Sequence, residues 1–178
     1  MLIRLQTKSR ILQWSCIELN VAQTIPPFYP QETDFSCAVA CLRMVLARFG
    51  MHRPEAELRE MCDCTIFGTT ALGLVRTARN LGFDDSRKHT LTLTDVKELT
   101  QQGHFPIVYV VLAREGLAPD VHSLVVVSIT ESEIGVLDPK RGALTLPIEE
   151  FIEMWSSLNN LAIVIARSPE PQTQTTSR

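Results

Sequence analysis

Residues 36–50 read SCAVACLRMVLARFG, and this stretch decides what the first half of the chain is expected to form. Its apolar side chains recur every three or four residues from Ala38 to Phe49, which is the spacing of one helix face. Ser36 is a residue type favoured at helix N-caps, and Gly50 is typical of a helix end. The stretch therefore predicts a buried helix with Cys37 in its first turn.

Working outward, three further short helices are expected in this half of the chain. Each has apolar residues at helical spacing and begins or ends at residues that commonly bound helices. Pro54 opens the first of them, and Thr69 or Thr70 caps the second. The predicted helices are residues 55–62, 71–81 and 95–102.

The pattern changes from residue 106 onward. Segments of strand length rich in Val, Ile and Leu alternate there with turn residues. These segments are residues 106–112, 122–129, 135–137, 143–146 and 161–166, with one more helix over 148–156. Helices followed by strands are typical of the α+β class, in which the helices pack against an antiparallel sheet. The sequence therefore predicts an α+β fold.

Composition agrees with one globular domain. The 178 residues are 45% hydrophobic and 21% charged, and domains usually have about 100–200 residues. Residues 26–167 are expected to form this domain. Residues 1–25 are an N-terminal extension in which 11–19 is a candidate added strand, and 168–178 form a polar tail expected to be disordered.

Charge and apolar runs exclude several classes of protein. A net charge of −3 argues against a nucleic-acid-binding domain, which would carry a basic excess. The longest apolar run, 107–113, falls far short of the roughly 18 residues of a membrane span. The N-terminus shows no secretory signal. Together with an odd count of five cysteines, this favours free thiols in the cytoplasm over a disulfide framework.

Cys37 is the first candidate functional residue. A thiol at a helix N-terminus faces unpaired backbone N–H groups and the positive end of the helix dipole, and both stabilise a thiolate. A nucleophilic cysteine is expected in such a place. A small residue packed in the first turn of a core helix is the alternative.

A cysteine nucleophile needs an imidazole as its base and an acceptor that orients the imidazole. His52, His89 and His104 fall in segments expected to be solvated loops. His122 differs because it opens an apolar strand, where a site can form at the edge of the sheet. A surface histidine at a strand start is the alternative.

Two further residues complete a candidate site. Asp138 ends the strand expected to pair with the strand of His122, which would bring the two side chains within reach. A turn-forming aspartate is the alternative. Gln31 lies six residues before Cys37, and its amide could join the backbone N–H of Cys37 as a pair of oxyanion donors.

Several short motifs, in order along the chain, resemble those of the bacteriocin-processing peptidases. These are papain-like cysteine peptidases that cleave leader peptides after a double glycine. The resemblance extends from Pro30 to about Ala166. Its motifs are Pro30-Gln31, residues 36–46 with Gly50, residues 68–74, Gly103 with 106–108, residues 122–127, residues 137–139 with Gly142, and Glu150-Phe151 with Trp155.

The resemblance implies a papain-like fold and a role for each candidate residue. Cys37 would be the nucleophile, His122 the general base and acid, Asp138 the residue that orients His122, and Gln31 an oxyanion donor. The expected partners are a peptide or leader-peptide substrate and a separate ABC exporter, since the chain has neither a membrane span nor a Walker motif. Ser123 stands where the family commonly has an aromatic residue.

Three other functions match parts of the same pattern. Four thiols, at Cys37, Cys41, Cys62 and Cys64, could hold zinc, although their spacing only half matches a structural zinc site. A binding module that holds a leader peptide without cutting it would share the fold. An acyl transferase would share the acyl-enzyme and differ only in the group that accepts the acyl chain. The expected peptidase needs neither a cofactor nor a metal.

Overall fold

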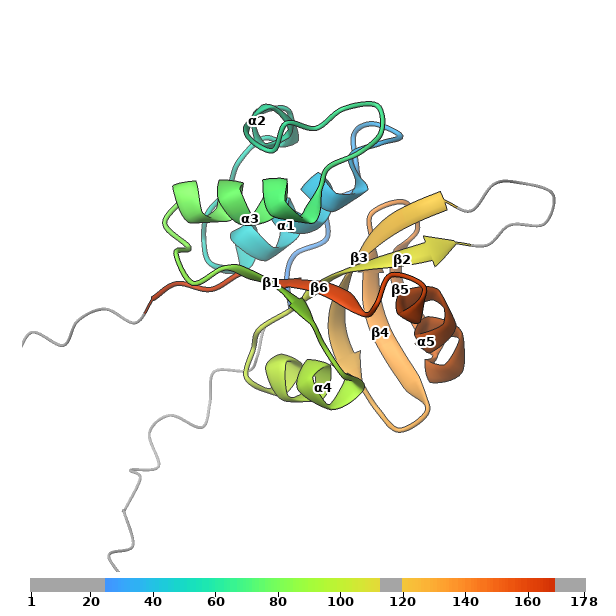
Figure 1. Cartoon of the computed structure of the whole chain (residues 1–178). Helices are drawn as coiled ribbons and strands as arrows, with labels where there is room; N and C mark the ends of the chain where they lie inside the picture. The colour runs from blue at the N-terminus through green and yellow to red at the C-terminus, as the bar shows by residue number, and fades with distance from the viewer. Residues whose placement is uncertain (1–24, 113–119, 169–178) are drawn as a thin grey trace, which may run out of the picture.

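The computed structural model describes residues 25–112 and 120–168 (Figure 1). The candidate strand over 11–19 and nearly all of the expected tail lie outside these residues. The described helices are α1 (Cys37–Arg48), α2 (Glu55–Met61), α3 (Ala71–Asn80), α4 (Leu93–Gln101) and α5 (Ile148–Ser156). The described strands are β1 (Arg87–Thr90), β2 (Ile107–Leu112), β3 (Asp120–Ile129), β4 (Glu133–Asp138), β5 (Gly142–Pro147) and β6 (Leu161–Val164).

The six strands form one sheet in the order β1-β6-β2-β3-β4-β5, and every neighbouring pair is antiparallel. Strands β3 and β4 pair as the hairpin expected from the sequence, and Val125 lies opposite Leu137. Helices come first in the chain and most of the sheet follows. The predicted α+β class is therefore confirmed.

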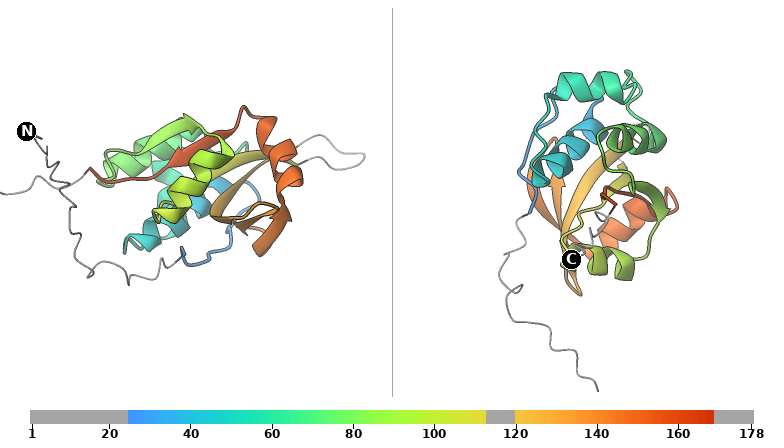
Figure 2. Two further views of the ribbon diagram at one scale, coloured as in Figure 1. Left: turned by 90° about the horizontal axis from the view of Figure 1, so that it is seen from below. Right: turned by 90° about the vertical axis from the view of Figure 1, so that its left-hand side faces the viewer.

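Helices cover both faces of this sheet (Figures 1 and 2). Alternate residues of a strand point to opposite faces, so each strand can contribute to two cores. Ile107 and Tyr109 of β2 pack with the buried residues of α1, α2 and α3. Val108 and Val110 pack on the other side with the buried residues of α4 and α5. The site described below lies at the end of the sheet where β3 begins and β4 ends.

Helix α1 is the most buried helix of the fold, with nine of its residues in the core. Its N-cap position is Ser36, but no side chain caps it. The Ser36 hydroxyl instead accepts from the backbone N–H of Thr33 and donates to the Thr33 carbonyl, at 3.1 Å each. Ser36 is thus the N-cap residue, as predicted, but its side chain does not make the capping hydrogen bond to the helix. Among the described residues, no side-chain cap from Ser36 therefore occupies the N–H groups of the first turn of α1, which contains Cys37.

Strand β1 was not predicted. Its sequence, RKHT, is polar and mostly exposed, because β1 lies at the edge of the sheet and, among the described strands, pairs with β6 alone. Exposed edge strands commonly carry charged residues and lack the apolar alternation of buried strands. His89, expected in a loop, lies in this strand.

Candidate active site

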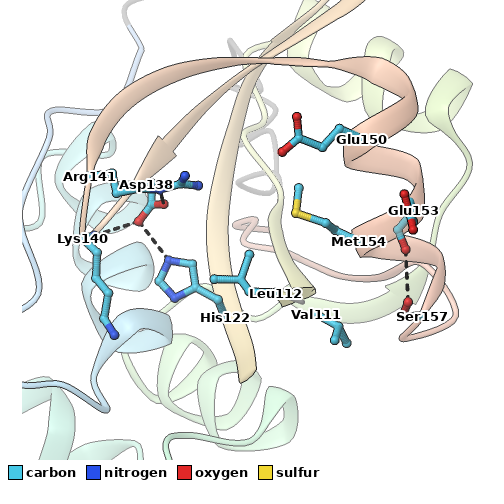
Figure 3. Close-up of a pocket in the computed structure, with 10 residues that line it drawn as sticks. All are labelled: Val111, Leu112, His122, Asp138, Lys140, Arg141, Glu150, Glu153, Met154 and Ser157. Carbon is cyan, nitrogen blue, oxygen red and sulfur yellow. Dashed lines mark hydrogen bonds and ion pairs between the residues drawn. The ribbon is translucent and has the colours of Figure 1, made fainter. Parts of the chain in front are cut away.

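The hairpin of β3 and β4 brings His122 and Asp138 together. The ring nitrogen Nε2 of His122 lies 2.9 Å from Oδ1 of Asp138, and Figure 3 shows the ring directed at the carboxylate. The two residues are 2% and 1% exposed. The hydrogen bond at Nε2 leaves Nδ1 as the ring nitrogen available to a thiol.

Asp138 is held by two more donors from the turn that follows it. The backbone N–H of Lys140 donates to Oδ1 at 2.8 Å, and Nε of Arg141 donates to Oδ2 at 2.6 Å. Burial acts to raise the pKa of Asp138, but the hydrogen bonds from His122, Arg141 and Lys140 outweigh it and hold the pKa well below its usual range. Asp138 is therefore a fixed carboxylate anion.

Burial likewise opposes the charged form of His122. Hydrogen bonds to Asp138 and Cys37, with the charges of both partners, outweigh burial and raise the pKa of His122 from 6.5 to about 9. At neutral pH the ring is therefore an imidazolium. An imidazolium beside a thiol can stabilise a thiolate and can later donate its proton.

Cys37 begins α1 and is half-buried. Burial acts to raise its pKa, but the polar interaction with His122, the charge of His122 and the polar groups of Ser123 lower the pKa below its usual 9.0. Burial dominates at two other cysteines: the pKa of Cys41 lies well above its usual value, and that of Cys62 rises to about 11. Activation of the thiol is thus specific to Cys37 among these three cysteines.

Gln31 is joined to the site by its backbone. Its N–H donates to the carbonyl oxygen of Pro139, the residue after Asp138, at 3.0 Å. Its side-chain Nε2 donates to the carbonyl oxygen of Thr33 at 2.6 Å, and one hydrogen of this NH₂ group is left over. The structure therefore joins His122 to Asp138 through their side chains and places Cys37 and His122 on the same cavity. The backbone of Gln31 is fixed to the residue after Asp138.

Two cavities meet at His122. One, of about 360 Å³, is lined by Cys37, His122 and the exposed apolar residues Ile66, Phe67 and Val121, among others. The other, of about 480 Å³, lies between Asp138 and α5 and also reaches His122 (Figure 3). A third cavity is lined by Gln31 and shares Asp34 and Lys140 with the cavity of Cys37. A peptide can reach the thiol from this surface.

The other candidates lie apart from this group. His52 is exposed. His104 lies in a loop and is partly exposed, and its Nδ1 is buried with no hydrogen-bond partner among the described residues. Within residues 25–112 and 120–168, no three His, Cys, Asp or Glu side chains form a group that could bind a metal ion. In the same residues, no helix is long and apolar enough to cross a membrane.

Arg141 is the member of the site that sequence analysis missed. Its contact with Asp138 arises from the turn between β4 and β5, where the two residues lie three apart. Basic residues are common in turns. The one sequence signal for Arg141 is its position three residues after Asp138, which was already a candidate site residue.

Comparison with known proteins relates the chain to one family. The model of the peptidase C39 family matches residues 26–170. The chain is 38% identical over 146 residues to the transport/processing ATP-binding protein ComA of Streptococcus pneumoniae, covering 80% of this chain and 19% of that protein. It is 27% identical over 128 residues to the lactococcin-G-processing and transport ATP-binding protein LagD of Lactococcus lactis, covering 72% of this chain and 17% of that protein. The chain thus spans about a fifth of the length of these relatives.

Solved structures show the same fold. The peptidase domain of Streptococcus ComA superposes with a TM-score of 0.68 at 27% identity, over 82% of this chain and 100% of that one. A double glycine motif protease from an AMS/PCAT transporter, solved in complex with the leader peptide, superposes with a TM-score of 0.66 at 20% identity, over 80% of this chain and 92% of that one. The fold and the family inferred from the motifs are both confirmed.

Proposed function

This chain belongs to the peptidase C39 family of cysteine peptidases, and we propose that it cleaves a leader peptide after a double glycine. The observation that carries the proposal is the buried pair of His122 and Asp138, 2.9 Å apart, with Cys37 lining the same cavity as His122. The pKa of the thiol is lowered there, and that of the imidazole is raised to about 9. This is the ionisation that a thiolate nucleophile with an imidazolium acid requires.

The first half of the reaction forms an acyl-enzyme. Sγ of Cys37 attacks the carbonyl carbon of the scissile bond and forms a C–S bond, and the carbonyl oxygen becomes an oxyanion. The backbone N–H of Cys37 and the free hydrogen of Gln31 Nε2 stabilise this oxyanion. His122 gives its proton to the leaving amine, the C–N bond breaks, and a thioester remains.

The second half returns the enzyme to its starting state. Neutral His122 takes a proton from water, and the hydroxide attacks the thioester carbonyl. The C–S bond breaks, the carboxylic acid product leaves and Cys37 is again a thiolate beside an imidazolium. Asp138 keeps the ring oriented in both halves through its bond to Nε2.

The same family relationship suggests the setting of the reaction. The relatives are transport and processing proteins with an ATP-binding part, so we propose that the cleaved peptide is cargo for an ABC exporter. The active domain would be residues 26–167, acting in the cytoplasm, where leader peptides are made. No cofactor takes part in these steps.

A direct test is to incubate the purified chain with synthetic peptides that contain a Gly-Gly site and a matched set in which Ala-Ala replaces it. Mass spectrometry should show a cut after the second glycine only, and the Cys37→Ala variant should show none. Adding a primary amine would reveal acyl transfer as an amide product. Binding of the peptides without any cleavage would overturn the proposal and favour a binding module.

A further inference from the structure

The segment that carries Gln31 is fixed by three consecutive backbone N–H groups. That of Gln31 donates to the carbonyl oxygen of Pro139 at 3.0 Å. That of Glu32 donates to Oε1 of Glu55 at 3.0 Å, and that of Thr33 donates to the Ser36 hydroxyl at 3.1 Å. Each amide thus binds a different part of the fold: the β4–β5 turn, α2 and the start of α1.

Of the three groups that accept these hydrogen bonds, Glu55 is a side chain from a different helix. It is the first residue of α2 and is separated from Glu32 by 23 positions. Its exposed fraction is 0%, although glutamate is among the residues least often buried. Packing alone therefore does not explain why glutamate occupies this buried position.

The two oxygens of Glu55 are used unequally. Oε1 accepts from Glu32, whereas Oε2 is buried and has no hydrogen-bond partner among the described residues. A buried oxygen without a partner costs free energy of folding. The useful property of Glu55 is therefore the acceptor at Oε1, which ties the residue after Gln31 to the body of the protein.

We propose that Glu55 is a positioning residue for the oxyanion donor: it holds the Gln31 segment in place from α2, and it does so as a hydrogen-bond acceptor. This rests on the proposed function, because Gln31 matters only if an oxyanion forms. Placement matters in such a site, since a donor displaced by about 1 Å can cost up to roughly a hundredfold in rate.

The inference predicts a difference between two variants of nearly equal shape. Glu55→Gln keeps an oxygen that can accept from Glu32, whereas Glu55→Met fills the same space without a strong acceptor. Glu55→Met should lower kcat about tenfold with little change in KM, because the lost interaction acts in the transition state. Glu55→Gln should keep most of the kcat. Glu57→Met, on the exposed part of the same helix, is the matched control and should leave kcat unchanged.

A double variant tests whether Glu55 acts through Gln31. In the Gln31→Ala background, Glu55→Met should cause little further loss of kcat, because the donor that it positions is already absent. Alkylation of Cys37 at acid pH should be the same in all these variants, since His122 sets the thiolate. A role in stability alone would lower the melting temperature of Glu55→Met without producing this pattern of kcat values.

Each other outcome counts against the inference. With wild-type cleavage intact, three results would overturn it. The kcat of Glu55→Met could equal that of Glu57→Met, or Glu55→Gln could lose as much kcat as Glu55→Met. The third is that the losses of Gln31→Ala and Glu55→Met multiply in the double variant. If the wild-type chain cleaves no peptide, the proposed function fails and this inference fails with it. If Glu55→Met does not fold, Glu55→Ala removes the same acceptor and replaces it in the comparison.

Discussion

Arg141 donates a hydrogen bond of 2.6 Å from Nε to Oδ2 of Asp138, on the oxygen that His122 does not use. The carboxylate is thereby held from both sides. Arg141 is half exposed whereas Asp138 is buried, so this ion pair connects the buried end of the site to solvent.

Removing Arg141 should loosen the carboxylate. In Arg141→Ala, Oδ2 loses a donor, so the pKa of Asp138 should rise toward its usual value and the orientation of His122 should weaken. We expect kcat to fall several-fold, a modest loss because the pair is partly solvated. Arg141→Lys should recover only part of it, since lysine does not present the guanidinium geometry. Unchanged kcat in Arg141→Ala would show that His122 and Lys140 suffice to hold Asp138.

Removing Asp138 should be less severe than removing Cys37 or His122. In Asp138→Ala the ring keeps its own basicity but loses its orientation and the hydrogen bond that raises its pKa. The pKa of His122 should fall, so the alkaline limit of activity should move to lower pH while kcat drops. Steady-state kinetics as a function of pH measures both effects. If the variant is unfolded by circular dichroism, Asp138 is a structural turn residue.

Selective alkylation should identify the activated thiol. At about pH 6 an ordinary thiol is less than about 1% thiolate. Cys37 has a lowered pKa, whereas burial raises the pKa of Cys41 and Cys62. A brief iodoacetamide pulse should therefore label Cys37 far faster than the other cysteines, as read by peptide mapping. His122→Ala should slow the labelling of Cys37 alone; uniform slow labelling in the wild type would contradict an activated thiol.

The pH range of activity follows from the same pair. Burial opposes both charges, but their contact lowers the pKa of Cys37 and raises that of His122 to about 9. The active form, thiolate with imidazolium, is lost in acid when Cys37 takes up a proton and in alkali when His122 loses one. We expect kcat/KM to form a bell whose alkaline limb falls near pH 9. A profile that keeps rising beyond this pH would show that His122 does not act as the acid.

Local patterns predicted most of the fold. Helix α1 and the central strands have apolar residues at the spacing of their structures. Glycine follows α1, and the turn between β4 and β5 contains proline. These signals act over a few residues, so they can be recognised in one sequence. Strand β1 lacks the signal because its side chains face solvent, and its pairing with β6 depends on residues more than seventy positions away.

The sequence predicts those site residues whose position in a helix or strand can be recognised from neighbouring residues. Cys37 begins a helix, His122 opens an apolar strand and Asp138 ends its hairpin partner. The supporting contacts had no such signal. The bond from Glu32 to Glu55 joins two segments whose sequences give no indication of the pairing, and the Ser36 hydroxyl binds Thr33 where capping preference favours the helix. These bonds are set by the packed fold.

The place of β6 in the sheet has a consequence for synthesis on the ribosome. This strand comes last among the described strands, yet it lies inside the sheet, between β1 and β2. The ribosome releases α1 and its thiol more than a hundred residues earlier. The sheet that contains His122 is complete only when residues 161–164 have left the exit tunnel, because β6 joins β1 to β2. Synthesis of the described strands thus ends with the one that joins β1 to the rest of the sheet, so β1 reaches its place only after all the other strands have been made.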